Sequence, residues 1–284
     1  MLIAEISSNH SRSLERCLNF IKSAKKCGFD AVKFQLFKID ELFTKEVLEL
    51  SSAHESRRQW EFPIEFLGPV SDACKQHDLK LGVTPFYLDA VKEAAQYVDF
   101  LKVASYELMW LDLHSTIIKQ NLPTIISTGM AELEEIITIR NLYKSKGFDL
   151  DKLSFLHCES NYPANYKTIN LAAIDTMRKQ LGCQIGWSDH TKDVDVICNV
   201  MFGYGVNMVE MHFDLDGKGE EAMGGHCWLP SDMQILMQKI TKFKAMTGNG
   251  LKQPALTELK ERDWRADPSD GLRPTMKIRD NLQL

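Results

Sequence analysis

The chain has 284 residues, of which 44% are hydrophobic and 26% are charged, and its formal net charge is −5. This composition is typical of a globular protein, and the acidic balance argues against a nucleic acid or an acidic membrane surface as the partner. A small anionic substrate is compatible with it, because a few lysines in a pocket are enough to bind one.

Short apolar segments alternate with longer amphipathic segments along the chain. The expected strands are residues 2–6, 31–36, 80–83, 99–103, 124–126, 153–156, 184–187 and 206–211. The expected helices are residues 14–27, 64–76, 87–96, 111–120, 133–146, 171–180, 194–202 and 231–246. Eight strand–helix units predict an α/β fold of the (β/α)8 or TIM-barrel type. An open doubly wound sheet is the alternative, but no Gly-x-Gly-x-x-Gly follows any expected strand.

Two segments interrupt the alternation. Residues 37–62 are charged and are expected to form a long functional loop. After residue 250 the sequence becomes polar and is punctuated by proline and glycine. We therefore expect a catalytic barrel over residues 1–250 and a C-terminal tail over residues 251–284 that forms no independent domain.

The sequence also predicts where the protein works. No apolar run approaches the roughly 20 residues of a membrane span, and the start of the chain predicts a strand rather than a secretory signal. The seven cysteines are scattered and form no Cys-x-x-Cys pair. We therefore expect a cytoplasmic protein with reduced thiols.

Polar side chains gather at the C-terminal ends of the expected strands, where (β/α)8 barrels carry their active sites. Lys33 and Lys102 are the most informative, because burying an ammonium is costly unless an anion compensates it. They predict a clamp for a phosphate or carboxylate, completed by the hydroxyls of Thr84, Ser105, Ser127 and Ser188. The alternative is a structural network in which the lysines pair with carboxylates, namely Glu5, Glu107 or Glu210.

Two histidines follow the last two expected strands. His190 and His212 would rise from the same end of the barrel if those strands are parallel neighbours. Paired neutral imidazoles are suitable ligands for a divalent metal and leave coordination positions free for substrate. Two unrelated histidines at loop starts are the alternative.

Several segments together resemble one family. They are Ala4-Glu5-Ile6 with Asn9-His10, Ala31-Val32-Lys33-Phe34-Gln35, Thr84-Pro85-Phe86, Leu101-Lys102-Val103-Ala104-Ser105, Ser127-Thr128-Gly129-Met130, Leu156-His157-Cys158 with Asn161-Tyr162-Pro163, Trp187-Ser188-Asp189-His190-Thr191 and Glu210-Met211-His212-Phe213. In this order they closely resemble the sialic acid synthase family, the phosphoenolpyruvate-dependent synthases of nonulosonic acids. The resemblance runs from residue 2 to about residue 250.

This resemblance implies a (β/α)8 barrel that condenses phosphoenolpyruvate with the open-chain aldehyde of an N-acylated hexosamine. The products would be phosphate and a 3-deoxy-2-keto sugar acid, and a divalent metal would be required, commonly Mn²⁺, with Mg²⁺ or Co²⁺ as alternatives. By resemblance, His190 and His212 are the metal ligands and Glu5 stands near the reacting carbons. The residues implied to hold phosphoenolpyruvate are Lys33, Thr84, Lys102, Ser105, Ser127 and Ser188. Those implied to face the sugar are Gln35, Glu107 and Tyr162.

The chain also departs from the family pattern. The family usually carries a C-terminal antifreeze-like domain that lends an arginine to the partner subunit's sugar. The chain is expected to be a short member without that domain, with Arg265 or Arg273 as a substitute, and a homodimer is compatible with the resemblance. Met223 stands where the family has a sugar-contacting aspartate, and Glu159 stands where it has Thr or Ser. We therefore expect the phosphoenolpyruvate and metal half of the site to be intact and the acceptor sugar to be unusual.

Two other functions stay open at this point. One is a related barrel aldolase that uses another keto-acid donor. The other is a non-catalytic paralogue that binds a sugar or pairs with an active subunit. The retained Glu5, Lys33 and Lys102 argue against a silent paralogue, because buried charges without a function are costly.

Overall fold

The computed structural model describes residues 1–281. The chain separates into two compact units, residues 1–241 and the segment that begins at Lys242. Among the helices of the described residues, none combines the length and the apolar character needed to cross a membrane.

The first unit is a closed barrel of eight parallel strands in sequence order, in which β8 returns to pair with β1. The strands are β1 (Leu2–Glu5), β2 (Ala31–Leu36), β3 (Lys80–Pro85), β4 (Phe100–Val103), β5 (Thr124–Ser127), β6 (Leu153–His157), β7 (Gln184–Asp189) and β8 (Val209–His212). The prediction of a (β/α)8 barrel is confirmed.

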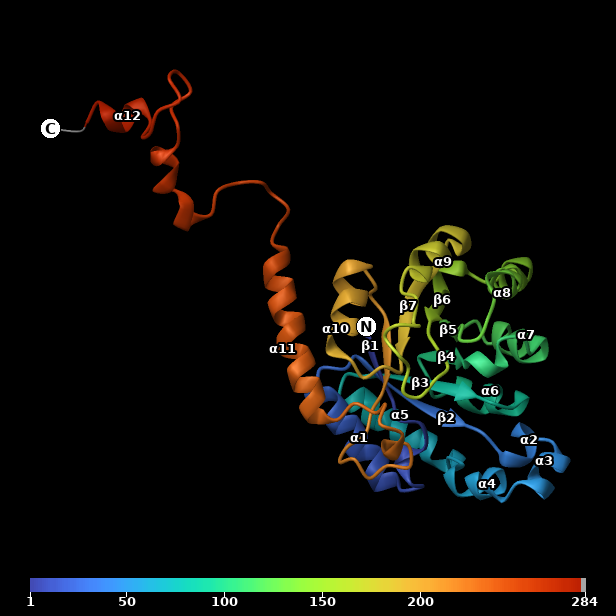
Figure 1. Ribbon diagram of the computed structural model, residues 1–284. Coiled ribbons are helices and arrows are strands. Elements are labelled where there is room, and N and C mark those ends of the chain that lie inside the picture. The colour runs from blue at the N-terminus through green and yellow to red at the C-terminus, as the bar shows by residue number, and fades with distance from the viewer. Residues whose placement is uncertain (282–284) are drawn as a thin grey trace. The chain divides into compact units, whose positions relative to one another are not determined.

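Helices follow the strands and surround the barrel (Figure 1). They are α1 (Leu14–Lys26), α5 (Leu67–Gln76), α6 (Leu88–Ala95), α7 (Leu111–Ile118), α8 (Leu133–Ser145), α9 (Ala173–Leu181), α10 (Val194–Cys198) and α11 (Pro230–Thr247). All eight expected helices are present. The expected helix 64–76 opens with a 3-10 turn, Ile64–Phe66, and the expected helix 194–202 ends in a π-helix, Asn199–Gly203.

Helix α1 illustrates why these segments become helices. Ser13 caps its N-terminus, because the Ser13 hydroxyl accepts a hydrogen bond from the backbone N–H of Arg16. Cys17, Ile21 and Ala24 follow at helical spacing and are all buried. One face of the helix thus packs against the barrel.

Alternate residues of each strand point into the barrel and divide its interior into an apolar floor and a polar mouth. The floor is a buried cluster of Ile3, Ala31, Phe100, Ile125, Leu156 and Met208. Two residues further along the same strands come polar side chains, as in Ile3 and Glu5 or Phe100 and Lys102. Because side chains alternate with a period of two, the polar residues share the inward face of the apolar ones.

Residues 37–62 differ from the long loop that the sequence predicts. They contain α2 (Ile39–Leu42), α3 (Lys45–Leu50), α4 (Ser52–Glu55) and a 3-10 turn, Ser56–Trp60. Helices α3 and α4 have no buried residue, so they leave no apolar periodicity for a sequence pattern to detect. Ion pairs of Arg58 with Asp40 and Glu55 hold the segment together instead.

The second unit contains two 3-10 helices, Leu256–Glu258 and Glu261–Trp264, and α12 (Met276–Arg279). Its organising group is the carboxylate of Asp267, which accepts hydrogen bonds from the backbone N–H groups of Ser269 at 2.9 Å and Met276 at 2.7 Å. The expected tail lies within this unit, together with Arg265 and Arg273. Residues 282–284 of that tail lie outside the described residues.

Gly186 provides a test of how tightly the barrel wall is packed. A Cβ at this position would lie 2.5 Å from Leu156 Cδ2 and 2.6 Å from the backbone oxygen of Met208. Since a backbone atom of the adjacent chain cannot move aside cheaply, Gly186→Ala should lower the free energy of unfolding by about 2 to 3 kcal/mol, measured by urea denaturation.

The matched control is Gly147→Ala. Gly147 has a φ of +73°, but a Cβ at this position would have no atom within 4 Å of it. Its substitution should therefore lower the free energy of unfolding by only about 1 kcal/mol, the cost of holding alanine in a left-handed backbone conformation. Equal losses for the two variants would contradict the packing argument.

Candidate active site

The first group of site residues lies on β1, β2 and β3. Lys33 forms an ion pair with Glu5 and donates a hydrogen bond to Thr84 Oγ1 at 2.6 Å. Gln35, the next inward residue of β2, donates through Nε2 to Glu5 Oε1 at 2.9 Å. Their positions in the sequence predict that these four residues share one mouth, and the structure brings them into direct contact.

The second group lies on β4, β5, β7 and β8. Lys102 Nζ donates hydrogen bonds to Ser127 Oγ at 2.6 Å and to the Val103 carbonyl at 3.1 Å. It also lies 3.8 Å from Glu210 Oε1. Ser188 Oγ lies 3.5 Å from the same carboxylate oxygen. Because β4 and β8 are not neighbours in the sheet, the contact between Lys102 and Glu210 crosses the interior of the barrel.

Burial opposes the charged form of both lysines, and the nearby carboxylates determine whether the pKa of each lysine is raised or lowered. Desolvation lowers the pKa of Lys33, but the attraction of Glu210 and Glu5 outweighs it and raises that pKa. For Lys102, desolvation prevails over the attraction of Glu210, and its pKa is lowered. Lys102 is therefore the cation that an incoming anion would stabilise most.

The two carboxylates of this layer also differ. Burial raises the pKa of Glu5 despite the positive charge of Lys33. The pKa of Glu210 is lowered, because Lys102 and Lys33 together outweigh its desolvation. These pairings match the structural alternative given above, in which the lysines are balanced by carboxylates. The anion clamp accordingly stays a prediction.

His190 and His212 occupy the ends of neighbouring parallel strands, and their ring centroids lie 5.4 Å apart. His190 Nδ1 donates to the carbonyl of Glu159 at 2.6 Å, and His212 Nδ1 donates to Glu221 Oε2 at 2.8 Å. Nδ1 is therefore engaged in both rings, which leaves both Nε2 atoms for another partner. Imidazoles oriented in this way by a carbonyl and a carboxylate are typical metal ligands. The residues present thus fit a divalent metal.

Tyr162 covers the histidine pair at the rim. Its ring lies 4.1 Å from that of His190, 5.6 Å from that of His212 and 5.0 Å from that of His226. Burial of the phenol raises its pKa, so the hydroxyl stays neutral at physiological pH. The family resemblance implies that Tyr162 faces the sugar, and in the structure its ring lies against the histidine rings.

The remaining expected residues follow β4. Ser105 Oγ accepts a hydrogen bond from the backbone N–H of Gly129 at 3.0 Å and lies 3.4 Å from Cys158 Sγ. Glu107 is half-buried, and its Oε2 has no hydrogen-bond partner in the described residues. Desolvation raises the pKa of Glu107 to about 7, although the charge of Lys102 opposes the shift. Glu107 can therefore exist as a neutral acid or as a carboxylate near neutral pH.

Two residues of the site have no assigned role in the sequence analysis. Glu221 and His226 lie in the connection from β8 to α11, and one ligand atom from each, together with one from His212, fall within 4.8 Å of one another. Met223, expected at the place of a sugar-contacting aspartate, is 97% exposed instead. A histidine and a glutamate shortly after His212 were visible in the sequence, but their spacing matches no regular element.

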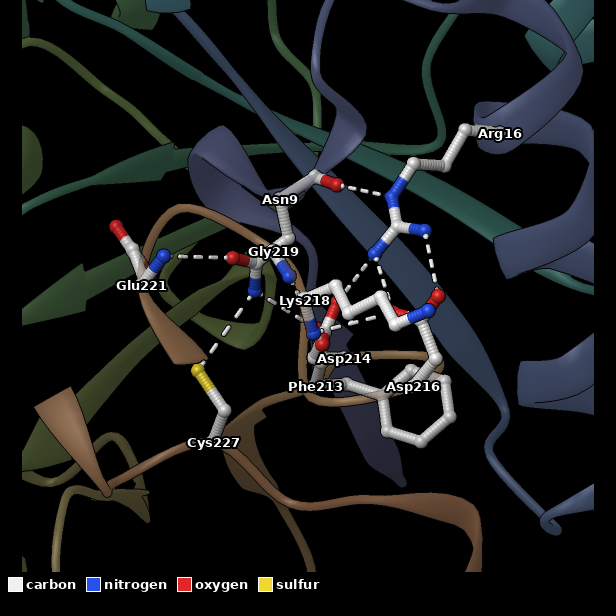
Figure 2. A network of polar contacts seen from close by, with 9 residues as sticks. All are labelled: Asn9, Arg16, Phe213, Asp214, Asp216, Lys218, Gly219, Glu221 and Cys227. Carbon is white, nitrogen blue, oxygen red and sulfur yellow. Dashed lines mark hydrogen bonds and ion pairs between the residues drawn. The ribbon is translucent and has the colours of Figure 1, made fainter. Parts of the chain in front are cut away.

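A polar network fixes the start of this connection (Figure 2). Asn9 donates to the Phe213 carbonyl at 3.2 Å and accepts from the backbone N–H of Glu221 at 2.9 Å. Arg16 donates to Asp214 Oδ1 at 2.8 Å and to Asp216 Oδ1 at 2.9 Å. Asn9 and Asp214 are fully buried. The network therefore sets the backbone position from which the Glu221 side chain reaches His212.

The fold and its polar mouth define the chain as a (β/α)8-barrel enzyme. A family model described as the NeuB family matches residues 20–252. The chain is 33% identical over 282 residues to N,N'-diacetyllegionaminic acid synthase of Legionella pneumophila, covering 91% of this chain and 76% of that protein. It is 30% identical over 261 residues to pseudaminic acid synthase of Campylobacter jejuni. That match covers 88% of this chain and 75% of that protein.

A solved structure agrees with these relatives. The N-acetylneuraminic acid (sialic acid) synthetase of Leptospira borgpetersenii, determined with citrate, superposes with a TM-score of 0.80 at 25% identity and covers 92% of this chain and 89% of that one. The chain belongs to the NeuB family, the sialic acid synthase family that its motifs resemble. It is accordingly an enzyme, because these relatives are synthases.

The raised pKa of Glu107 predicts a pH dependence of stability. A carboxyl group whose folded pKa is raised contributes its stability fully below the unfolded value, near 4.5, and loses it as the pH rises through the folded value, near 7. Relative to Glu107→Gln, the wild-type protein should lose up to about 3 kcal/mol of unfolding free energy across this window. Urea titrations of chelator-treated protein at stepped pH would measure it.

Glu65→Gln is the control, because Glu65 is an exposed carboxylate outside the site. This variant should follow the wild-type pH profile. Parallel profiles for wild type and Glu107→Gln would show that the Glu107 carboxyl is not desolvated in solution.

Proposed function

We propose that the chain joins phosphoenolpyruvate to the open-chain aldehyde of an amino sugar or related aldose and releases phosphate. The product would be a 3-deoxy-2-keto sugar acid of the nonulosonic type. The observation that carries this proposal is the convergence of Lys33, Lys102, His190 and His212 on one barrel mouth in a chain of the NeuB family.

The donor would bind in the lysine layer. Its phosphate and carboxylate would take hydrogen bonds from Lys33 and Lys102 and from the hydroxyls of Thr84, Ser105, Ser127 and Ser188. An incoming anion competes with Glu5 for Lys33 and raises the low pKa of Lys102. Binding would therefore turn a balanced set of buried charges into a site that holds the departing phosphate.

The acceptor would enter from the rim, where Gln35, Glu107 and Tyr162 lie. The chemistry requires C3 of the enol phosphate to attack the aldehyde carbon, water to add at C2, and the C2–O bond to the phosphate to break. A divalent ion at His190 and His212, with Mn²⁺ as the first expectation, would supply Lewis acidity toward the aldehyde oxygen. Glu5 would accept the proton that the water loses, and Glu107 could give a proton to the alkoxide.

The names of the relatives support the acceptor class without choosing a member. They are synthases of legionaminic, pseudaminic and N-acetylneuraminic acid, three different nonulosonic acids. An N-acylated amino sugar is therefore the first acceptor to test. The seven cysteines, all free, suit a reducing compartment such as the cytoplasm.

The deciding experiment measures phosphate release from phosphoenolpyruvate with a panel of aldoses in Mn²⁺. We expect release that depends on one class of N-acylated aldose, with a product mass that accounts for the aldose and the pyruvate unit. Turnover only with another keto-acid donor would favour the aldolase alternative. No turnover with any donor, in protein shown to be folded, would favour the silent paralogue.

Lys33→Ala should lower the turnover number at least ~10²-fold, because a buried charge-assisted hydrogen bond contributes up to about 3 kcal/mol. Steady-state kinetics of phosphate release would measure it, with thermal unfolding as a check that the variant is folded, because the change leaves Glu5 buried without its partner. Lys25→Ala is the control, since Lys25 pairs with the exposed Asp78 on the protein surface. Near-normal kinetics in folded Lys33→Ala would contradict the clamp.

A further inference from the structure

His226 is a buried imidazole without a hydrogen-bond partner. Its side chain is 7% exposed, and neither Nδ1 nor Nε2 makes a hydrogen bond within the described residues. A buried polar group left unpaired costs about 1 to 3 kcal/mol, and native proteins rarely tolerate it without a use. Glu221 lies nearby, but its Oε2 is 3.8 Å from His226 Nε2, beyond hydrogen-bond distance.

The ring of His226 also faces the histidine pair described above. Its centroid lies 4.7 Å from that of His212, and His212 lies 5.4 Å from His190. The ring of Tyr162 lies 4.1 Å from that of His190 and 5.0 Å from that of His226, so both histidines border the same tyrosine. Three imidazoles from separate chain segments therefore lie in a row, with the ring of His212 adjacent to those of both His190 and His226.

The local sequence explains how His226 reaches this place. Gly225 has a φ of +77°, a conformation that other residues rarely adopt, and it turns the chain back toward the barrel. A Cβ on Gly224 would lie 2.8 Å from His226 Nδ1, so only glycine leaves room for the ring. The pair Gly224-Gly225 thus turns His226 inward, whereas Met223, which precedes Gly224, is exposed to solvent.

Contacts of the two residues that follow, Cys227 and Trp228, hold the backbone at His226 in this position. The backbone N–H of Trp228 donates to the His212 carbonyl at 2.7 Å, and Trp228 Nε1 donates to Asp189 Oδ2 at 2.9 Å. Asn9 Nδ2 contacts Cys227 Sγ at 3.6 Å (Figure 2). Long-range contacts of the next two residues therefore fix the backbone that carries the ring.

We propose that His226 is a third protein ligand of the metal that His190 and His212 are proposed to bind. Glu221 would orient His212 through Nδ1, as the carboxylate of a carboxylate–histidine–metal arrangement. The inference rests on the metal site of the proposed function and extends its ligand set. A third imidazole keeps positions open for substrate oxygens and strengthens the binding of borderline ions such as Zn²⁺ and Co²⁺ more than that of Mn²⁺.

The test measures metal binding without any turnover. Chelator-stripped wild-type protein and its variants are titrated with Co²⁺, followed by the visible absorption of the bound ion, and with Zn²⁺ and Mn²⁺ in competition with a chromogenic chelator. We expect His226→Ala and His226→Gln to weaken Zn²⁺ and Co²⁺ binding about tenfold or more and to change the Co²⁺ spectrum. Mn²⁺ binding should weaken less.

Two further variants sharpen the result. His226→Asp replaces an imidazole by a carboxylate and should shift the preference toward Mn²⁺ and Mg²⁺, which a purely structural role would not do. His77→Ala removes a histidine outside the site and should bind all ions like the wild type. Unfolding curves of the metal-free proteins show that each variant is folded.

The outcomes separate this inference from the proposed function. Wild-type Zn²⁺ and Co²⁺ affinities with an unchanged Co²⁺ spectrum in folded His226→Ala and His226→Gln would overturn the third ligand, even if the enzyme condenses phosphoenolpyruvate with an aldose. Conversely, a protein that turns over no donor but binds Co²⁺ in a His226-dependent way would support the ligand and contradict the synthase proposal.

Discussion

The pairing of β8 with β1 is the constraint on which the site depends. It aligns Glu5 with His212, while the pairing of β1 with β2 aligns Glu5 with Lys33. Closure of the ring also gives every strand two neighbours, so the backbone hydrogen bonds of the barrel have no free edge. With the strands fixed in this register, the period of two along each strand places ionisable side chains on one level of the interior. A shift of one residue in either pairing would turn Glu5 out of the barrel.

The same geometry makes the charges of the mouth interdependent. Glu5, Glu210, Lys33 and Lys102 are each almost completely buried, so each depends on the others for compensation. The opposite pKa shifts of Lys33 and Lys102 express this dependence, because the first is attracted by two carboxylates and the second is not sufficiently compensated. In a pocket whose buried charges compensate one another in this way, one added anion changes the electrostatic environment of every charged group. That property suits a reaction that begins with an anionic donor and ends with free phosphate.

The sequence was sufficient to predict the barrel and most of its mouth. Period-two strands such as 31–36 carry Lys33 and Gln35 at positions that the fold alone turns inward, so their convergence follows from topology. Helices α3 and α4 escaped prediction because they bury nothing and so lack periodicity.

Glu221 and His226 were missed for a different reason. The path of the chain between β8 and α11 is determined by Asn9, more than 200 residues earlier, and by a glycine turn rather than by local spacing. No periodic pattern encodes a conformation that depends on a distant partner. The exposed position of Met223 follows from the same turn.

The Asn9 network has a consequence for how the protein is made. Asn9 acquires these partners only after the segment around Phe213 and Cys227 has been synthesised. Until then β1, which carries Glu5, lacks its neighbouring strand β8, and the mouth is incomplete. Chains dominated by contacts of such long sequence separation fold more slowly than chains with local contacts. The mouth therefore requires the completed ring, and a chain that ended before β8 would lack the strand that aligns His212 with Glu5.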